Sequence, residues 1–223
     1  MRLSYFKYGI DLFLEENQVD IMVLEHPHVY TEMMSELLKQ CAGEEGAWQL
    51  SEGDKDLVFS KCISIVHTPF QLELNSKKNL NYLYKEMQII SDEYAYENIS
   101  EINSNIVAYL DVISQKLPYQ IDYNLELEPA QLYKQYEVRL DLEGTSLLEK
   151  VLNYIQLEKI LCNTKLIVFT NLKNYFDKEQ LEEIYMTAAY NKIFILLIET
   201  QKKYYIAGEK YCIIDNDKCL IMH

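Results

Sequence analysis

Lys165-Leu-Ile-Val-Phe-Thr-Asn-Leu172 and Lys192-Ile-Phe-Ile-Leu-Leu-Ile-Glu199 are the two stretches that decide the fold of this 223-residue chain. Each is a nearly continuous apolar run, which is typical of a strand buried on both faces of a parallel sheet. Between them, Asp177 precedes residues with apolar side chains at helical spacing, which predicts a helix. Strand, helix and strand together form a right-handed βαβ unit, the building block of nucleotide-binding α/β sheets.

The same pattern continues on both sides of this unit. Ser146 and Glu149 form a capping-box signature at the start of a helix that we expect to end at Leu161. Near the amino terminus, Val19–Glu25 has the composition of a first buried strand, and His28–Cys41 has helical spacing. The sequence therefore predicts an α/β fold with a mostly parallel sheet.

The residues that would hold a nucleotide are missing from this scaffold. A phosphate cradle needs glycines that let the backbone approach the anion, and none of the six glycines belongs to such a motif. After the first strand the sequence reads Glu25-His-Pro-His-Val-Tyr-Thr31, in which Pro27 removes an amide donor. At the end of Leu166–Phe169, where an ATPase would place a magnesium-binding acid, Thr170 and Asn171 follow. We expect a head that resembles a P-loop NTPase without the phosphate loop, and no enzymatic activity.

Residues 71–141 have a different character from the rest of the chain. Their apolar residues step by three and four in two series: Leu80, Leu83, Met87, Ile90 and Tyr94, then Ile99, Ile102, Ile106, Tyr109 and Ile113. This spacing predicts two long helices packed side by side, and Pro129 is suited to start a short third helix. We expect a helical leg over 71–141, inserted between head segments 1–70 and 142–223.

Composition restricts the location and the partners of the protein. The chain is 49% apolar and its longest uninterrupted aliphatic or aromatic run, Ile193–Ile198, is far too short to span a membrane. Its start lacks the apolar core of a signal peptide, and the five cysteines form no CxxC pair. We therefore expect a cytoplasmic protein with reduced thiols and no membrane partner.

The order and spacing of several segments resemble one known family. The segments are Ile21–Glu25, Leu72–Ser76, Leu148–Gln156, Leu166–Asn171, Phe176–Leu181, Ile195–Glu199 and Cys212–Asp217, and they extend over most of the chain. They resemble the Csn-type accessory family that serves spacer acquisition in type II-A CRISPR–Cas systems. The resemblance implies a calcium-binding homotetrameric ring that holds linear double-stranded DNA at its ends, ignores its sequence, and works with other CRISPR adaptation proteins.

One acidic segment could hold the calcium that the resemblance implies. Asp122, Asn124, Glu126 and Glu128 alternate with apolar residues, so that four oxygen donors fall on one side of an extended segment. Calcium prefers such hard oxygen ligands, although the spacing is not that of an EF-hand. The solvated face of an amphipathic strand would give the same pattern.

The net charge of the chain opposes DNA binding, because 21 basic minus 35 acidic residues gives −14. A ring could still bind a duplex by directing its few cations into one shared hole. Lys77 and Lys78 stand at a helix start, where cations oppose the helix dipole, and are possible phosphate contacts. Four other candidates precede the leg or flank the return from it: Lys55, Lys61, Lys134 and Arg139.

The sequence also allows a transition-metal site and functions other than DNA binding. His26-x-His28 with Glu32 could supply ligands to a transition metal, although a loop followed by a helix explains the same residues. The scattered histidines do not support a catalytic triad. The alternatives to a DNA-binding ring are a degenerate nucleotide-fold enzyme and an acidic scaffold that binds only protein.

Overall fold

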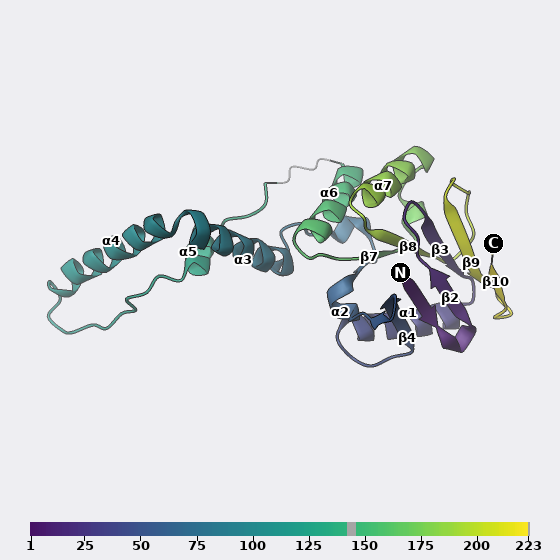
Figure 1. Cartoon of the computed structure of the whole chain (residues 1–223), viewed down its shortest axis with the longest axis horizontal. Helices are drawn as coiled ribbons and strands as arrows, with labels where there is room; N and C mark the ends of the chain where they lie inside the picture. Colours follow the sequence, from purple (N-terminus) through teal and green to yellow (C-terminus); the bar gives the residue numbers. More distant parts are fainter. Residues whose placement is uncertain (142–145, 223) are drawn as a thin grey trace. The chain divides into compact units, whose positions relative to one another are not determined.

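The computed structural model describes residues 1–141 and 146–222, and the chain divides into two compact units (Figure 1). The head comprises Met1–Leu74 and Leu142–His223, and the leg comprises Asn75–Asp141. The sequence places the first crossing between residues 70 and 71, whereas the compact units divide between Leu74 and Asn75.

The main sheet of the head has six strands in the order β10-β9-β3-β8-β7-β6. The strands are β3 Val19–Leu24, β6 Ile63–Val66, β7 Leu166–Thr170, β8 Phe194–Glu199, β9 Glu209–Ile214 and β10 Leu220–Met222. Neighbouring strands are parallel except for β10, which pairs antiparallel with β9. Every residue of β3 and β7 is buried, as expected for central strands covered on both faces. The predicted α/β fold with a mostly parallel sheet is confirmed.

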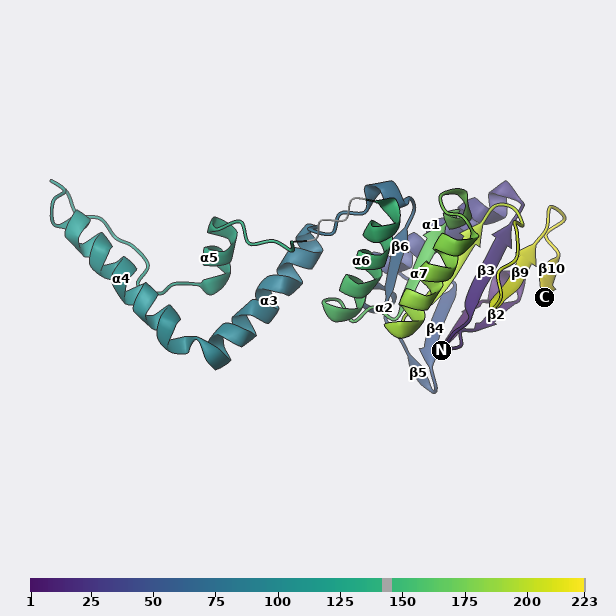
Figure 2. The ribbon, with the colours of Figure 1, turned by 90° about the horizontal axis from the view of Figure 1, so that it is seen from above.

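Three long helices accompany this sheet: α1 Pro27–Cys41, α6 Leu147–Ile160 and α7 Lys178–Tyr190. The predicted capping box of α6 is present, and Asp177 forms a second one with Gln180 at the start of α7. Helices α6 and α7 lie side by side on one face of the sheet (Figure 2). These caps satisfy amide groups that the first turn of a helix leaves unpaired.

A small antiparallel sheet completes the head, in the order β2-β1-β4-β5. Its strands are β1 Arg2–Tyr5, β2 Ile10–Phe13, β4 Trp48–Glu52 and β5 Lys55–Asp56. The side chains of this sheet, of α1 and of one face of the main sheet form one buried apolar cluster. Within it, the indole of Trp48 donates a hydrogen bond to the carbonyl of Met33 on α1 over 3.1 Å. Short helical segments connect the larger elements: η1 Phe6–Tyr8, α2 Phe59–Cys62, η2 Pro69–Gln71 and η3 Leu172–Asn174.

The leg consists of α3 Lys77–Tyr94, α4 Tyr96–Ser114 and α5 Pro129–Gln135. Only Ala95 separates α3 from α4, which is too short a connection for the second helix to fold back along the first. The predicted side-by-side packing of the two long helices is therefore wrong. Instead α5 packs on α3, where the rings of Tyr84 and Tyr133 lie 5.9 Å apart. The spacing located two amphipathic helices correctly but could not indicate what covers their apolar faces.

The crossover from β8 to β9 contains no helix, although both strands run parallel to β3 between them. The buried ammonium group of Lys173 holds this segment. It donates to the carbonyl of Tyr204 over 2.8 Å, to the hydroxyl of Tyr211 over 2.9 Å, and pairs with Glu209 at 2.6 Å. Such a buried pair is stable only because its remaining groups are hydrogen-bonded, and Tyr185 also donates to Glu209 over 2.8 Å.

Candidate nucleic-acid interface

The carboxyl ends of the parallel strands are where an open α/β sheet binds a nucleotide, and here α1 begins at that edge without a glycine loop. Pro27 is at the first turn of α1, and His26 caps the helix by accepting a hydrogen bond from the amide of His28 over 3.2 Å. A histidine ring and a proline thus occupy the position at which backbone amides would meet a phosphate. The predicted absence of a phosphate loop agrees with this local structure.

The neighbouring strand ends are equally unsuited to a nucleotide. Asn171, which follows β7, adopts the left-handed conformation at φ 52° and accepts a hydrogen bond from the amide of Thr200 over 3.2 Å. Glu199, at the end of β8, is 1% exposed and accepts the amide of Lys173 over 3.1 Å. Its second carboxyl oxygen has no hydrogen-bond partner among the described residues, and burial raises the pKa of this carboxyl. A buried acid at this edge disfavours a bound phosphate.

The six cations proposed from the sequence are all exposed. Lys55 and Lys61 belong to the head, on β5 and in the last turn of α2. The other four belong to the leg: Lys77, Lys78, Lys134 and Arg139. All six are therefore accessible to solvent and to an anionic partner.

Three of the leg cations come from backbone segments that lie side by side. The side-chain amide of Asn75 donates to the carbonyl of Leu140 over 3.1 Å and accepts from the amide of Leu140 over 2.8 Å. This two-way bond joins the segment that leads into Lys77 and Lys78 with the segment that carries Arg139. The hydroxyl of Tyr84 adds a bond to the carbonyl of Val138 over 2.9 Å. We call Lys77, Lys78 and Arg139 the basic cluster.

The acidic segment does not form a metal site in this structure. Asp122 accepts a hydrogen bond from the amide of Tyr123 over 3.0 Å, and Asn124 accepts one from the amide of Glu126 over 3.1 Å. Glu128 accepts from the side chain of Gln131 over 3.2 Å. Across residues 1–141 and 146–222, no three His, Cys, Asp or Glu side chains gather as metal ligands would. The calcium site at these four residues stays a prediction.

The histidines near α1 have structural roles that the sequence left open. The imidazole of His26 caps α1, and the nearest contact between His28 and Glu32 is 3.8 Å. Glu32 is already engaged, because it pairs with Lys7 and accepts a hydrogen bond from Tyr8 over 2.8 Å. These contacts account for Glu32 without a metal ion.

Lys173 is buried, and no sequence pattern predicts this. A lysine that follows a strand is normally a solvated loop residue, and its partner Glu209 lies 36 positions further along the chain. No local pattern links two such residues, so only the folded structure could pair them.

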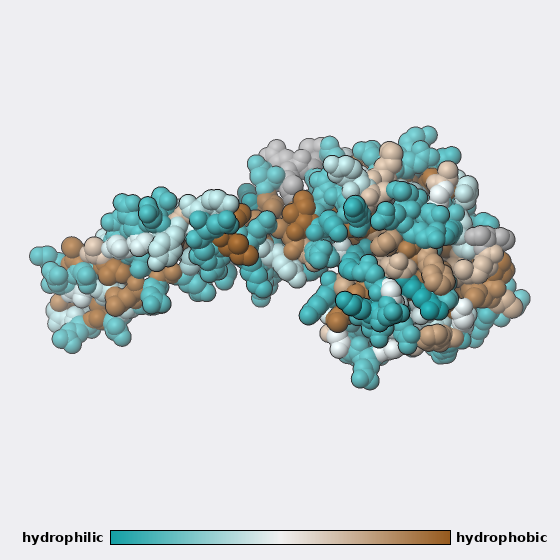
Figure 3. All heavy atoms as spheres, in the orientation of Figure 1, coloured by the Kyte–Doolittle hydropathy of each residue, from teal (hydrophilic) through white to brown (hydrophobic). Residues whose placement is uncertain are grey.

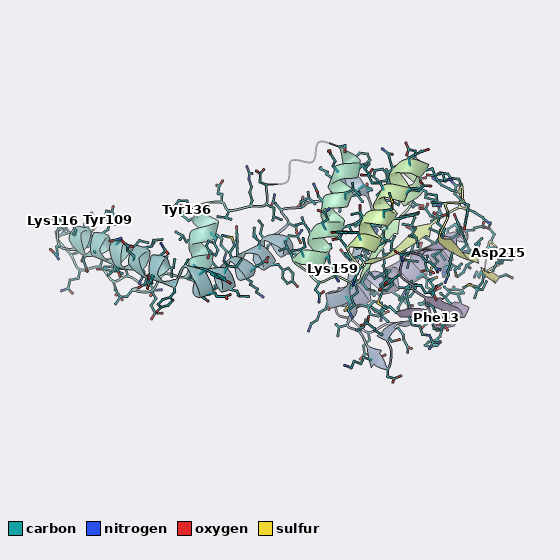
Figure 4. The ribbon with its side chains drawn as sticks, turned by 45° about the horizontal axis from the view of Figure 1, so that its top comes forward. Phe13, Tyr109, Lys116, Tyr136, Lys159 and Asp215 are labelled. Carbon is teal, nitrogen blue, oxygen red and sulfur yellow. The ribbon has the colours of Figure 1, made fainter. Side chains whose placement is uncertain are left out.

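The leg also exposes a broad apolar surface, visible as brown areas in Figure 3. Helix α4 buries no residue, and its exposed large hydrophobic side chains are Tyr96, Ile102, Ile106, Tyr109, Val112 and Ile113. Figure 4 shows Tyr109 on this helix and Lys116 beyond its end. An apolar face of this length on a thin helical unit is typical of a protein interaction surface.

No helix of the described chain is both long and apolar enough to cross a bilayer.

These features define a nucleotide-type α/β head without a phosphate cradle and with an inserted helical leg. The profile of the family described as CRISPR-associated protein (Cas_Csn2) matches residues 40–218. The chain belongs to this family, and it is accordingly a CRISPR-associated protein.

One curated relative and two solved structures are similar to this chain. A CRISPR-associated protein Csn2 from Enterococcus faecalis is 22% identical over 133 residues, which span 57% of this chain and 58% of that relative. The crystal structure of Stu0660 of Streptococcus thermophilus is also similar. The match covers 100% of this chain and 76% of the Stu0660 chain, with a TM-score of 0.65 and 13% sequence identity. At this identity the structural likeness shows the fold alone. An ATP-binding cassette of an ABC transporter, MJ1267, has a TM-score of 0.48 and 15% identity.

Proposed function

We propose that this protein supports spacer acquisition in CRISPR immunity by binding the ends of double-stranded DNA without reading its sequence and without catalysis. The protein would act as a homotetrameric ring in the cytoplasm, together with other CRISPR adaptation proteins. The observation that carries the proposal is the match of the Csn2 family profile over residues 40–218. The carboxyl ends of the parallel strands lack a glycine loop, and this supports a role without a nucleotide.

The basic cluster supports binding to the DNA backbone. Lysine and arginine contacts to phosphates supply affinity that does not depend on sequence and that weakens steeply with salt. The cluster is small for a chain of net charge −14, so one copy offers little attraction to DNA. Several copies arranged around one duplex would bring their clusters together, which favours an assembly over a monomer.

The exposed apolar face of α4 supports the assembly itself. A second copy of the leg offers the same face, and two identical faces can pair around a twofold axis. Such pairing would remove from water the side chains that a single chain leaves exposed. We propose that a second copy of the leg covers the apolar face of α4, because the leg lacks a core of its own.

The test compares linear DNA with covalently closed circles of the same sequence. A closed ring must load at an end, so linear fragments should bind while circles compete poorly, and bulky groups on both ends should prevent loading. Equal affinity for linear and circular DNA would overturn the ring.

Charge-reversed variants test which cations contact DNA. Lys77→Glu with Lys78→Glu, or Lys134→Glu with Arg139→Glu, should weaken binding to unrelated sequences alike and reduce the salt slope by about two for each chain that contacts the DNA. The matched control is Lys85→Glu with Lys116→Glu, which makes the same charge change elsewhere on the leg. If the control lowers the salt slope as much as the two test variants, the binding cations have been named wrongly.

Chelation tests the calcium proposal. If calcium joins chains through the acidic segment, EDTA should lower both the melting temperature and the mass in solution. Glu126→Gln with Glu128→Gln should abolish this response, with Glu44→Gln and Glu45→Gln as a control pair on the head. A normal response to EDTA in the test variant would place the calcium site elsewhere.

Two further measurements separate the alternatives. Saturable ATP binding by calorimetry would favour a degenerate nucleotide-fold enzyme over a DNA-binding ring. A folded protein that binds no linear duplex, with or without calcium, would favour an acidic scaffold that binds only protein.

A further inference from the structure

The crossover from β8 to β9 passes one face of the main sheet without a helix. A crossover between parallel strands normally contains a helix that packs on the sheet face. Here the chain passes over β3 in the extended segment 200–208, held by Lys173 and Glu209. The face next to α7 therefore lacks the side chains that a helix would supply.

A pocket of about 580 Å³ lies at this place, in the head alone. Its walls are the last turns of α7, the end of the crossover segment and the residues that precede β3; Ala189, Ile206 and Asn17 represent the three walls. Its floor includes Val19 and Phe194, the first residues of β3 and β8. The pocket thus lies at the amino ends of the parallel strands, opposite the edge at which such sheets bind nucleotides.

The lining of the pocket is mainly apolar. Ile193, Ile195 and Ile206 are buried around it, while Met186 is 66% exposed at its rim. The volume is within the range of pockets that bind small molecules, and a largely apolar lining is typical of them. A concave site of this size suits a small molecule better than a flat protein surface.

The charges at the rim do not select an ion of either sign. Lys165 pairs with Glu52, and Glu15 pairs with Lys210 at 2.7 Å. The remaining rim charges are two acids and two lysines: Glu16, Glu182, Lys159 and Lys192. Lys159, labelled in Figure 4, lies in the last turn of α6, where a lysine complements the helix dipole. Lys159 and Lys165 are therefore explained without an anionic ligand.

We propose that this pocket is a binding site for a small, uncharged and largely apolar molecule with aromatic rings or a short acyl chain. The apolar part would rest on Val19, Phe194 and Ile206, and any neutral polar group would face the solvent at the rim. The site is separate from the basic cluster and does not depend on the proposed binding of DNA.

The neutral fluorophore N-phenyl-1-naphthylamine tests the proposal on the full chain, because its emission increases when it leaves water. We expect saturable binding of one molecule per chain. Ala189→Trp fills the pocket from α7 and should weaken binding at least about tenfold. Glu183→Trp places the same side chain on an exposed position of α7 that does not line the pocket, and it should bind the probe normally.

A second variant keeps the test decisive if Ala189→Trp destabilises the head. Ala207→Trp adds the same bulk from the exposed end of the crossover segment, where folding is little affected. The absence of saturable binding to the native chain would overturn the proposal. Unchanged affinity in a filled variant that melts like the native chain would also overturn it.

Discussion

The head and the leg contain helices with similar amphipathic patterns, yet these helices bury very different amounts of surface. Helix α1 of the head has 15 residues and buries Val29, Met33, Met34 and Leu37. Helix α4 of the leg has 19 residues and buries none. Since burial of apolar surface is the main stabilising term in folding, the head is stable by its own core and the leg is not. An amphipathic pattern therefore specifies a face of a helix but not the partner that covers it.

The difference in burial suits the head and the leg to different tasks. A head with central strands buried on both faces can hold a fixed shape as a monomer. A leg with only Asn79 and Tyr84 buried among its described helical residues depends on a contact outside its own chain. We therefore expect substitutions in the head to change stability and substitutions in the leg to change assembly.

The largest effect is expected in the interior of the head. Lys173→Met removes the cation that holds the crossover segment and leaves the Glu209 carboxylate buried without its charge partner. Breaking a buried pair in this way costs about 3–5 kcal/mol of unfolding free energy, measured by denaturant titration. Lys202→Met, at an exposed lysine of the same segment, should change it by about 0.5 kcal/mol or less. A small effect of Lys173→Met would show that the head tolerates loss of this anchor.

An effect of intermediate size concerns the buried carboxyl of Asp20 on β3. Burial raises its pKa to about 6, Glu15 adds to this shift and Lys210 opposes it. Between about pH 4 and 6 the folded chain holds a proton that the unfolded chain has lost, so stability falls as the pH rises. The loss is about 3 kcal/mol, and Asp20→Asn should remove it from the pH profile of unfolding free energy.

Asp11→Asn is the control for Asp20→Asn. The guanidinium of Arg2 lowers the pKa of Asp11, so this pair stabilises the fold at higher pH and the contribution is lost as the pH falls. Asp11→Asn should therefore change the pH dependence of the unfolding free energy in the direction opposite to the change made by Asp20→Asn. Identical profiles for the native chain and Asp20→Asn would contradict the raised pKa.

The smallest effect on the head is expected from changes in the leg. Ile102→Ser with Ile106→Ser should leave the thermal unfolding of the head, followed through its single tryptophan Trp48, nearly unchanged. The same variant should lower the mass in solution, because the two side chains belong to the exposed face of α4. Glu101→Ser with Asn105→Ser is the matched control on the same helix. A native mass in the first variant would exclude this face as the contact between copies.

Much of the head could be predicted because its signals are local. The apolar runs at β7 and β8 and the caps at Ser146 and Asp177 involve residues a few positions apart. The absence of a phosphate loop is likewise a local property of the sequence after β3. Less of the candidate site could be predicted. The sequence identifies its cations, but no pattern of neighbouring residues indicates which of these cations share a surface.

The sequence by itself determined the parallel sheet, the inserted helical segment and the missing phosphate loop, since each depends on the spacing of neighbouring residues. Only the tertiary structure decided that Asn75 binds Leu140 and thereby joins the segments of the basic cluster. It also decided that Lys173 pairs with Glu209 and that the crossover between β8 and β9 contains no helix. The pocket beside α7 is likewise a feature of the tertiary structure. These contacts join residues far apart in the chain, and their energy comes from burial and hydrogen bonding that exist only after folding.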